Sequence, residues 1–184
     1  MTILQGKTVV LRPLTKEDAK LFVAWLNDPE VIKWLMWRDE KQALSLEFEE
    51  KWIEEMQKSN TWKAFMIEAI VGCAKIKVPI GNCSIHNIDW DNQRGGLGVT
   101  IGEKEFWNKG YGTEAAKLLL DYAFRELKLH RIESLALEDN IRSIRMLQKV
   151  GYTQEGCRRQ DALKGGCFRN VLIFGILCHE WKSE

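Results

Sequence analysis

The sequence predicts a single α+β domain, residues 1–184, built on a mixed β-sheet. Three observations support this class. The 184 residues are enough for one substantial hydrophobic core. Strand-like runs follow one another in the first half of the chain, and strand-like and helix-like runs alternate in the second half. The chain contains no repeat, low-complexity tract or linker, so nothing in it suggests a second domain.

The first half of the chain is expected to supply three helices and most of the strands. A strand over residues 8–14 has alternating apolar side chains, and Thr15 then caps a helix over residues 16–26. Asn27-Asp28-Pro29 ends that helix. The pattern continues with a short helix at 30–34, an acidic helix that starts at Ser45 and runs to about 59, and strands at 62–70, 79–88 and 96–101.

The second half begins with a glycine-containing loop and a long amphipathic helix over residues 111–127. We then expect a strand at 131–137, a helix at 141–150 and a strand at 152–160. Gly165-Gly166 predicts a hairpin turn before a last strand at 169–177. The ligand loop therefore follows a strand in the middle of the sheet.

Gly110 and Gly112 stand directly before the helix at 111–127, and this arrangement is typical of an anion site. The first N–H groups of a helix are unpaired and carry partial positive charge, and glycine lets a ligand approach the main chain. A pyrophosphate cradle over residues 108–113 is the main interpretation. A glycine turn that merely starts the helix is the alternative, because the dinucleotide fingerprint and the P-loop ending are both absent.

Composition excludes several classes of function. Lys plus Arg number 27 and Asp plus Glu number 26, so we expect neither direct nucleic-acid binding nor a membrane partner. The chain has no apolar run of transmembrane length and no signal-peptide core, which favours a cytoplasmic location. Five cysteines without a C-x-x-C pair, and three scattered histidines, predict no metal site. Cys83 and Cys178 are expected to act as small apolar residues in strand-like segments.

Two later segments complete a recognisable pattern. Asn140-Ile141-Arg142-Ser143 precedes Gly151-Tyr152-Thr153-Gln154-Glu155-Gly156, and both follow Trp107-x-x-Gly110-x-Gly112. Together they closely resemble the motifs of the GNAT superfamily of N-acetyltransferases. Leu11-Arg12-Pro13-Leu14 near the start and Phe174-Gly175-Ile176-Leu177 near the end extend the likeness over nearly the whole chain. The layout is similar to the RimJ/RimL branch, whose members acetylate N-terminal amines of ribosomal proteins.

This resemblance implies a GNAT fold with a mostly antiparallel mixed sheet and a V-shaped cleft for the cosubstrate acetyl-CoA. The cleft would lie between the strands at 96–101 and 131–137, and a main-chain N–H near Val99 to Ile101 would polarise the acetyl carbonyl. An amine would attack directly and form a tetrahedral intermediate. The residues expected to contact acetyl-CoA are Val99, Ile101, Trp107, Asn108, Lys109, Gly110, Tyr111, Gly112, Thr113 and Asn140.

The resemblance also assigns proton transfer, with two departures. Leu147 occupies the position where many members have a tyrosine acid, so Ser143 takes that role by analogy with the RimJ/RimL branch. Ser143 could equally just satisfy backbone groups in its helical turn, and Asn140 could simply cap the same helix. Gly96 replaces the usual glutamate, which leaves His86, Asp89 or Glu103 as possible bases. His86 is preferred because its unperturbed pKa lies near working pH.

The sequence therefore predicts an enzyme that moves acetyl to a primary amine, with a protein N-terminus, such as that of a ribosomal protein, as the expected acceptor. A small amine (polyamine, amino acid or aminoglycoside) is one alternative, and a catalytically silent acyl-CoA-binding module is another. Trp34, Trp37 and Trp90 could line an acceptor cleft, and acidic residues such as Glu50 and Glu54 could attract a basic acceptor. Both a monomer and a homodimer are compatible with the sequence.

Overall fold

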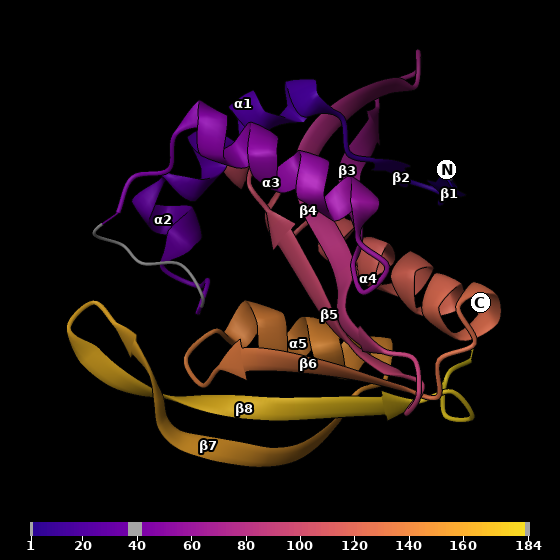
Figure 1. Ribbon diagram of the computed structural model, residues 1–184, viewed down its shortest axis with the longest axis vertical. Helices are drawn as coiled ribbons and strands as arrows, with labels where there is room; N and C mark the ends of the chain where they lie inside the picture. The colour runs from indigo at the N-terminus through magenta and orange to yellow at the C-terminus, as the bar shows by residue number, and fades with distance from the viewer. Residues whose placement is uncertain (1, 37–41, 183–184) are drawn as a thin grey trace.

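The computed structural model describes residues 2–36 and 42–182, which form one mixed sheet with helices on both faces (Figure 1). The sheet has the strand order β1-β2-β3-β4-β5-β6-β8-β7. Its strands are β1 (Leu4–Gln5), β2 (Val9–Pro13), β3 (Lys63–Val71), β4 (Ile76–Asp89), β5 (Arg94–Ile101), β6 (Arg131–Leu137), β7 (Thr153–Lys164) and β8 (Cys167–Leu177). Every strand pair is antiparallel except β5 with β6. The predicted α+β class is confirmed.

The helices are α1 (Ala19–Leu26), α2 (Pro29–Ile32), α3 (Leu46–Lys58), α4 (Tyr111–Asp121) and α5 (Ile141–Val150). Three short turns accompany them: 3₁₀ turns at Lys16–Asp18 and Lys104–Phe106, and a π-helical turn at Tyr122–Glu126. Ser45 begins α3 as predicted, since its hydroxyl accepts a hydrogen bond of 3.2 Å from the backbone N–H of Phe48. The sequence pattern thus placed each of these helices, but missed the 3₁₀ turn at Lys104–Phe106.

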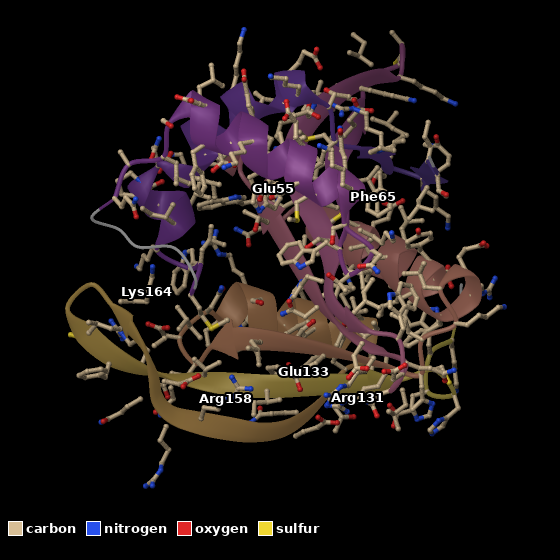
Figure 2. The ribbon with its side chains drawn as sticks, in the orientation of Figure 1. Glu55, Phe65, Arg131, Glu133, Arg158 and Lys164 are labelled. Carbon is tan, nitrogen blue, oxygen red and sulfur yellow. The ribbon has the colours of Figure 1, made fainter. Side chains whose placement is uncertain are left out.

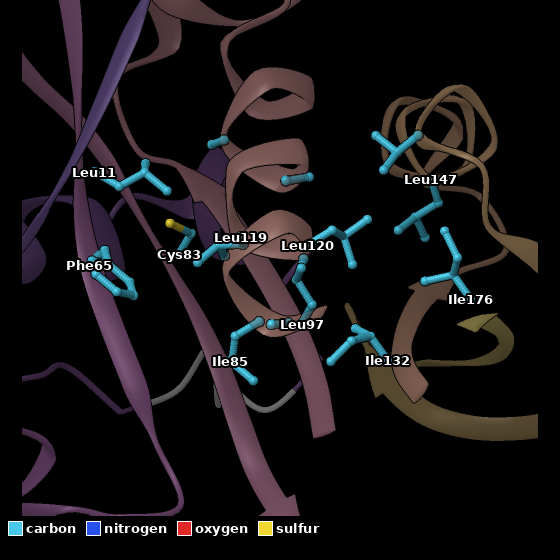
Figure 3. Packing of buried hydrophobic residues seen from close by; sticks show 14 of the residues in the cluster. Leu11, Phe65, Cys83, Ile85, Leu97, Leu119, Leu120, Ile132, Leu147 and Ile176 are labelled. Carbon is cyan, nitrogen blue, oxygen red and sulfur yellow. The ribbon is translucent and has the colours of Figure 1, made fainter. Parts of the chain in front are cut away.

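The main core lies between the sheet and helices α4 and α5. In Figure 3, Leu119 of α4 points toward Cys83 of β4, and Leu120 of α4 points toward Leu147 of α5. A second cluster covers the opposite face, where α1 and α3 pack against Met66 of β3. Because successive strand residues alternate between the two faces, β3 contributes to both clusters, with Phe65 and Ile67 in the first and Met66 in the second. The two faces of β5 are distinct: one packs against α4, and the other carries Gly96 and Gly98 beside the His86 ring of β4.

Several predicted boundaries were wrong, for identifiable reasons. The helix predicted at 16–26 begins as a 3₁₀ turn, and the helix predicted at 111–127 changes to π geometry at Tyr122. Strand β7 continues to Lys164 through Arg158 and Asp161, which periodicity did not favour. It pairs with β8 on one side only, so polar side chains on this edge strand remain in solvent. The short strand β1 lacks an apolar pattern and was not predicted.

The cysteines test a further expectation. Cys83 is buried, as expected, but Cys178 is exposed just beyond the end of β8, with its Sγ 3.6 Å from His130 Nδ1. The expectation for Cys178 was therefore wrong, because the strand stops one residue earlier. Within residues 2–36 and 42–182, none of the helices is long and apolar enough to cross a membrane.

The parallel strands β5 and β6 pair over a short stretch and then diverge. Arg94, Gly95 and Gly96 are the β5 residues opposite β6. Just beyond this stretch, the Ser134 hydroxyl of β6 donates a 3.0 Å hydrogen bond to the Leu97 carbonyl oxygen of β5. The diverging strands leave an opening in the sheet between them, as the predicted V-shaped cleft requires.

Candidate functional site

A cavity of about 1120 Å³ occupies this opening. The loop before α4, the start of α5, the region after α2 and the β7–β8 hairpin complete its walls. Eleven of the residues predicted to form the site line it: His86, Val99, Ile101, Trp107, Asn108, Gly110, Tyr111, Gly112, Thr113, Asn140 and Ser143. Lys109 does not line it, and its Nζ lies 5.8 Å from the centre of the Phe106 ring.

The loop before α4 has the backbone geometry of an anion cradle. Asn108 and Gly110 both have left-handed conformations, with φ of 60° and 92°. The Gly110 carbonyl accepts from the backbone N–H of Glu114 at 3.1 Å. The N–H groups of Tyr111, Gly112 and Thr113 thus precede the first bond of the helix and are available to a ligand. These donors suit a diphosphate group.

Trp107, in the loop before α4, and Arg142, near the start of α5, lie against each other in the wall of the cavity. The Trp107 indole N–H donates a 2.8 Å hydrogen bond to the Ile101 carbonyl, which holds the loop against the end of β5. The Arg142 guanidinium lies 4.1 Å from the centre of a Trp107 ring and 5.8 Å from that of Trp34. Trp107 thus contributes through packing and one hydrogen bond.

Asn140 and Ser143 lie together at the start of α5. The Asn140 side-chain oxygen accepts from the Ser143 backbone N–H at 3.2 Å, so Asn140 caps the helix. The Ser143 hydroxyl has no hydrogen-bond partner among the described residues and borders the cavity. Leu147, one turn further along, is packed in the main core (Figure 3). The hydroxyl of Ser143 is therefore available for chemistry.

The His86 imidazole lies over a strip of β5 that carries no side chains. His86 of β4 pairs with Gly96 of β5, and a methyl group built on Gly96 would lie 2.8 Å from His86 Cδ2 and closer still to Nε2. A methyl on Gly98 would lie 3.7 Å from His86 Cε1. The space that a side chain at position 96 would fill is thus taken by the histidine ring.

Trp62 covers the other side of the same imidazole, with ring centres 5.2 Å apart. Burial between these groups lowers the pKa of His86 below its ordinary value. Neither ring nitrogen has a hydrogen-bond partner among the described residues, and His86 borders the cavity. The result is a neutral imidazole at pH 7 that is free to accept a proton.

The other candidate bases are less suitable. Hydrogen bonds from Asn92, by its side chain and its backbone, lower the pKa of Asp89, and Arg94 lies 3.2 Å from the same carboxylate. Glu103 accepts a 2.8 Å hydrogen bond from the Trp25 indole and does not line the cavity. His86 is therefore the best-placed of the three.

Charged side chains that sequence reasoning had not selected also line the cavity. Glu133 of β6 lies beside Gly96 in the sheet, and its carboxylate is 3.5 Å from Arg131 (Figure 2). Asp161 and Arg158 of the β7–β8 hairpin pair at 3.6 Å. A glutamate in the alternating pattern of residues 131–137 was the available signal for Glu133. Its position beside Gly96 depends on a pairing between distant segments.

The predicted acceptor-side residues had mixed outcomes. Trp34 lines the cavity, Trp90 does not, and Trp37 lies outside the described residues. Glu50 and Glu54 of α3 each lie 3.2 Å from the Lys16 ammonium and do not border the cavity. These two carboxylates of α3 therefore pair with Lys16, in the 3₁₀ turn before α1, instead of facing the cavity. Across residues 2–36 and 42–182, no cluster of three His, Cys, Asp or Glu side chains is arranged to hold a metal ion.

Sequence comparison relates this chain to known acetyltransferases. The N-acetyltransferase p20 of Bacillus licheniformis is 30% identical over 184 residues, which covers 98% of this chain and 99% of p20. Spermidine N(1)-acetyltransferase of Escherichia coli K12 is 25% identical, covering 96% of this chain and 90% of that protein. The Bacillus subtilis protein named "Putative ribosomal N-acetyltransferase YdaF" is 34% identical over 104 residues, 56% of each chain.

Structure comparison gives the same fold. The crystal structure of spermidine N-acetyltransferase from Vibrio cholerae, in complex with CoA and spermine, superposes with a TM-score of 0.84. It is 19% identical and covers 95% of this chain and 98% of that one. The family model for the acetyltransferase (GNAT) domain matches residues 8–153. The chain therefore belongs to the GNAT family of acetyltransferases, enzymes that take their acetyl group from acetyl-CoA.

Proposed function

We propose that this enzyme acetylates the N-terminal α-amine of a protein or peptide, with a ribosomal protein as the preferred target, and that His86 is its general base. The observation that carries the proposal is the unpartnered, half-buried His86 imidazole over Gly96 at the cavity. The partial match to the YdaF protein supports the ribosomal target.

The protonation state of His86 fits an α-amine acceptor. An α-amine has a pKa of about 8, whereas a lysine amine has one of about 10.4. A neutral imidazole with a lowered pKa is a weak base, and it removes a proton more readily from the more acidic of these two ammonium groups. The missing glutamate at position 96 is therefore compatible with this acceptor class.

The residues around the cavity fit acetyl-CoA in the same arrangement. The N–H groups of residues 111–113 would bind its diphosphate, and Val99 and Ile101 present the end of β5 to the acetyl end of the cavity. Acetyl-CoA supplies an activated acetyl group as a thioester. Asn140 would orient its pantetheine arm, and Ser143 would donate a proton to the departing thiolate.

A polyamine acceptor is the second candidate, because the full-length E. coli relative is a spermidine acetyltransferase. The charges of the cavity favour it less. Asp89 and Asp161 each have an arginine partner, Arg94 and Arg158, so neither presents a free negative charge to a polycation. A site for a long polycation needs several carboxylates along its length.

The test is release of free CoA from acetyl-CoA with a panel of N-terminal peptides, spermidine, amino acids and aminoglycosides. We expect peptide turnover that falls about 10²-fold or more in His86→Gln and falls in Ser143→Ala. Acetyl-CoA affinity should be unchanged in His86→Gln, because that side chain is not in the phosphate cradle. Turnover with spermidine alone would support the second candidate. Tight acetyl-CoA binding without turnover of any amine would support a catalytically silent binding module.

A further inference from the structure

We propose that Glu133 binds the ammonium group of the acceptor and that the site recognises a single positive charge. This inference rests on the proposed function, because it takes the cavity face that carries His86 to be the acceptor side. It assigns the role of substrate binding to a residue that the family motifs do not mark.

The sheet register places Glu133 on the same face as His86. His86 pairs with Gly96 across β4 and β5, and Gly96 pairs with Glu133 across β5 and β6. Directly paired residues in a sheet project their side chains to the same side. Since Gly96 has no side chain, the imidazole and the carboxylate are successive functional groups along this row, with strands about 4.8 Å apart.

The carboxylate of Glu133 is incompletely neutralised. Its nearest cation is Arg131, at 3.5 Å. Arg131 is already engaged by Glu155 of β7, which accepts from both guanidinium Nη atoms, one of them at 2.6 Å. One arginine therefore serves two carboxylates, and this group of three carries a net charge of −1. The Glu133 side chain is 40% exposed and borders the cavity.

The other cavity carboxylates differ from Glu133 in this respect. Asp89 has Arg94, and Asp161 has Arg158, in one-to-one pairs. Among the carboxylates that line the described part of the cavity, Glu133 is thus the one that shares its arginine with a second carboxylate, and the remaining lining arginine, Arg142, lies against the ring of Trp107. One excess charge suits an acceptor with one ammonium group, such as a peptide N-terminus, better than a polyamine.

The two groups would then act in sequence on the amine. Glu133 binds the protonated form, which predominates at pH 7. His86 takes one proton from that ammonium, which leaves a neutral amine and an imidazolium. The amine nitrogen forms its bond to the acetyl carbon and the carbon–sulfur bond breaks. Ser143 would protonate the departing sulfur and regain a proton from the nitrogen, so that CoA leaves as the thiol and the amide is neutral, while the imidazolium returns its proton to solvent. The transfer moves one positive charge from the amine to the imidazole, and Glu133 lies in the same row of the sheet as that imidazole, so it stabilises the positive charge before and after the proton moves.

The experiment measures binding and turnover separately. Alanyl-alaninamide, with one ammonium group and no carboxylate, and its N-acetylated form, with no charge, are titrated by calorimetry into the enzyme saturated with CoA. We expect the wild type to prefer the charged probe, and Glu133→Gln to weaken its binding about 10- to 100-fold while leaving the neutral probe and CoA unaffected. Asp161→Asn removes a carboxylate from the same cavity and should leave all three affinities unchanged.

Equal affinity of Glu133→Gln and wild type for the charged probe would overturn the assignment, even if the enzyme acetylates peptides. Equal losses in Glu133→Gln and Asp161→Asn, together with tighter binding of spermidine than of the peptide, would overturn the single-charge recognition. Loss of the preference for the charged probe over the neutral probe in Glu133→Gln, but not in Asp161→Asn, supports the single-charge recognition. This binding result is independent of turnover, so failure of the proposed acetylation and failure of the Glu133 assignment are distinguishable.

Discussion

The absence of a side chain at position 96 is predicted to be a requirement of catalysis, and Gly96→Ala tests this. An added methyl group would lie 2.8 Å from His86 Cδ2, 3.0 Å from Cε1 and closest of all to Nε2. Carbon atoms in contact normally lie about 3.5–4.0 Å apart, so the imidazole must move. Trp62 covers the ring on its far side, so the ring can only swing into the cavity.

The expected effects on stability and on activity are very different. A half-buried ring that swings into a cavity loses packing and adopts a poorer rotamer, which costs about 1 kcal/mol of folding free energy. The displaced imidazole no longer faces the amine, and general-base catalysis is worth about 10²–10⁴-fold in rate. A loss of at least 10²-fold in kcat/KM corresponds to about 2.7 kcal/mol of transition-state stabilisation. Activity should thus fall far more than stability.

Gly98→Ala is the matched control on the same strand and the same face. Its methyl group would lie 3.7 Å from His86 Cε1 and 3.9 Å from Nδ1, which are ordinary contacts. NMR titration of the imidazole should therefore be unchanged in Gly98→Ala and altered in Gly96→Ala. Acetyl-CoA affinity, measured by calorimetry, should be retained in both variants.

A double-mutant cycle with His86→Gln gives the refutation. If Gly96→Ala acts by displacing the histidine, the double variant should be no less active than His86→Gln alone. Losses that multiply would show that position 96 acts independently of His86, and a fully active Gly96→Ala would show that the imidazole position is irrelevant to catalysis. Either result would refute the reasoning.

Three further predictions concern pH, core packing and a buried ion pair. Burial lowers the pKa of His86, so its imidazole stays neutral to below about pH 6.5. The fall of kcat/KM on the acid side should therefore lie below that pH, and it should be absent from the pH profile of His86→Gln. The same group binds more protons when unfolded, so its contribution to stability should decline as pH falls from 6.5 toward the folded-state pKa, which differential melting of wild type and His86→Gln would reveal. Leu147→Tyr should not supply the missing acid, because Leu147 is 1% exposed. The larger side chain should overpack the core and lower the free energy of unfolding, measured by urea denaturation, by about 1–3 kcal/mol. A gain in kcat would contradict the buried placement of this residue. Asp18 accepts two 2.7 Å hydrogen bonds from Arg12, so Asp18→Asn should lower the free energy of unfolding by about 3 kcal/mol. An unchanged midpoint of urea denaturation would show that the ion pair with Glu68 alone is enough to stabilise the arginine.

Local sequence pattern was sufficient for most of the fold because the dominant forces there are local. Caps such as Ser45 and Asn140, and breakers such as Pro29, act within a few residues, and amphipathic periodicity identifies the buried face of α4. The ends of the strands were harder to predict from the sequence. The extension of β7 to Lys164 depends on pairing with β8, and pairing tolerates polar residues on an edge strand.

The site was predictable where one segment forms it. The predicted phosphate loop is a continuous stretch that lines the cavity, so its glycines alone suggested an anion site. Asn140 and Ser143 share one helical turn and were found together for the same reason. Lys109 was included through its neighbours, yet its side chain lies by Phe106 and not at the cavity. A linear motif therefore identifies a loop better than it identifies the side chains that face the ligand.

The proposed base and ammonium-binding groups were harder to predict because they are distributed across three strands. Gly96 replaces the glutamate that is usual in the family. Along the sequence of β5 alone, this replacement looked like the loss of a catalytic base. In the sheet, the same position is bordered by His86 on β4 and Glu133 on β6, segments that are ten residues before and 37 residues after it in the chain. A functional group above a given point of a sheet can come from any adjacent strand, because neighbouring strands lie only about 4.8 Å apart and a side chain can span that distance. The glycine and the histidine thus form one feature: the first leaves the space that the second occupies, and only the register connects them.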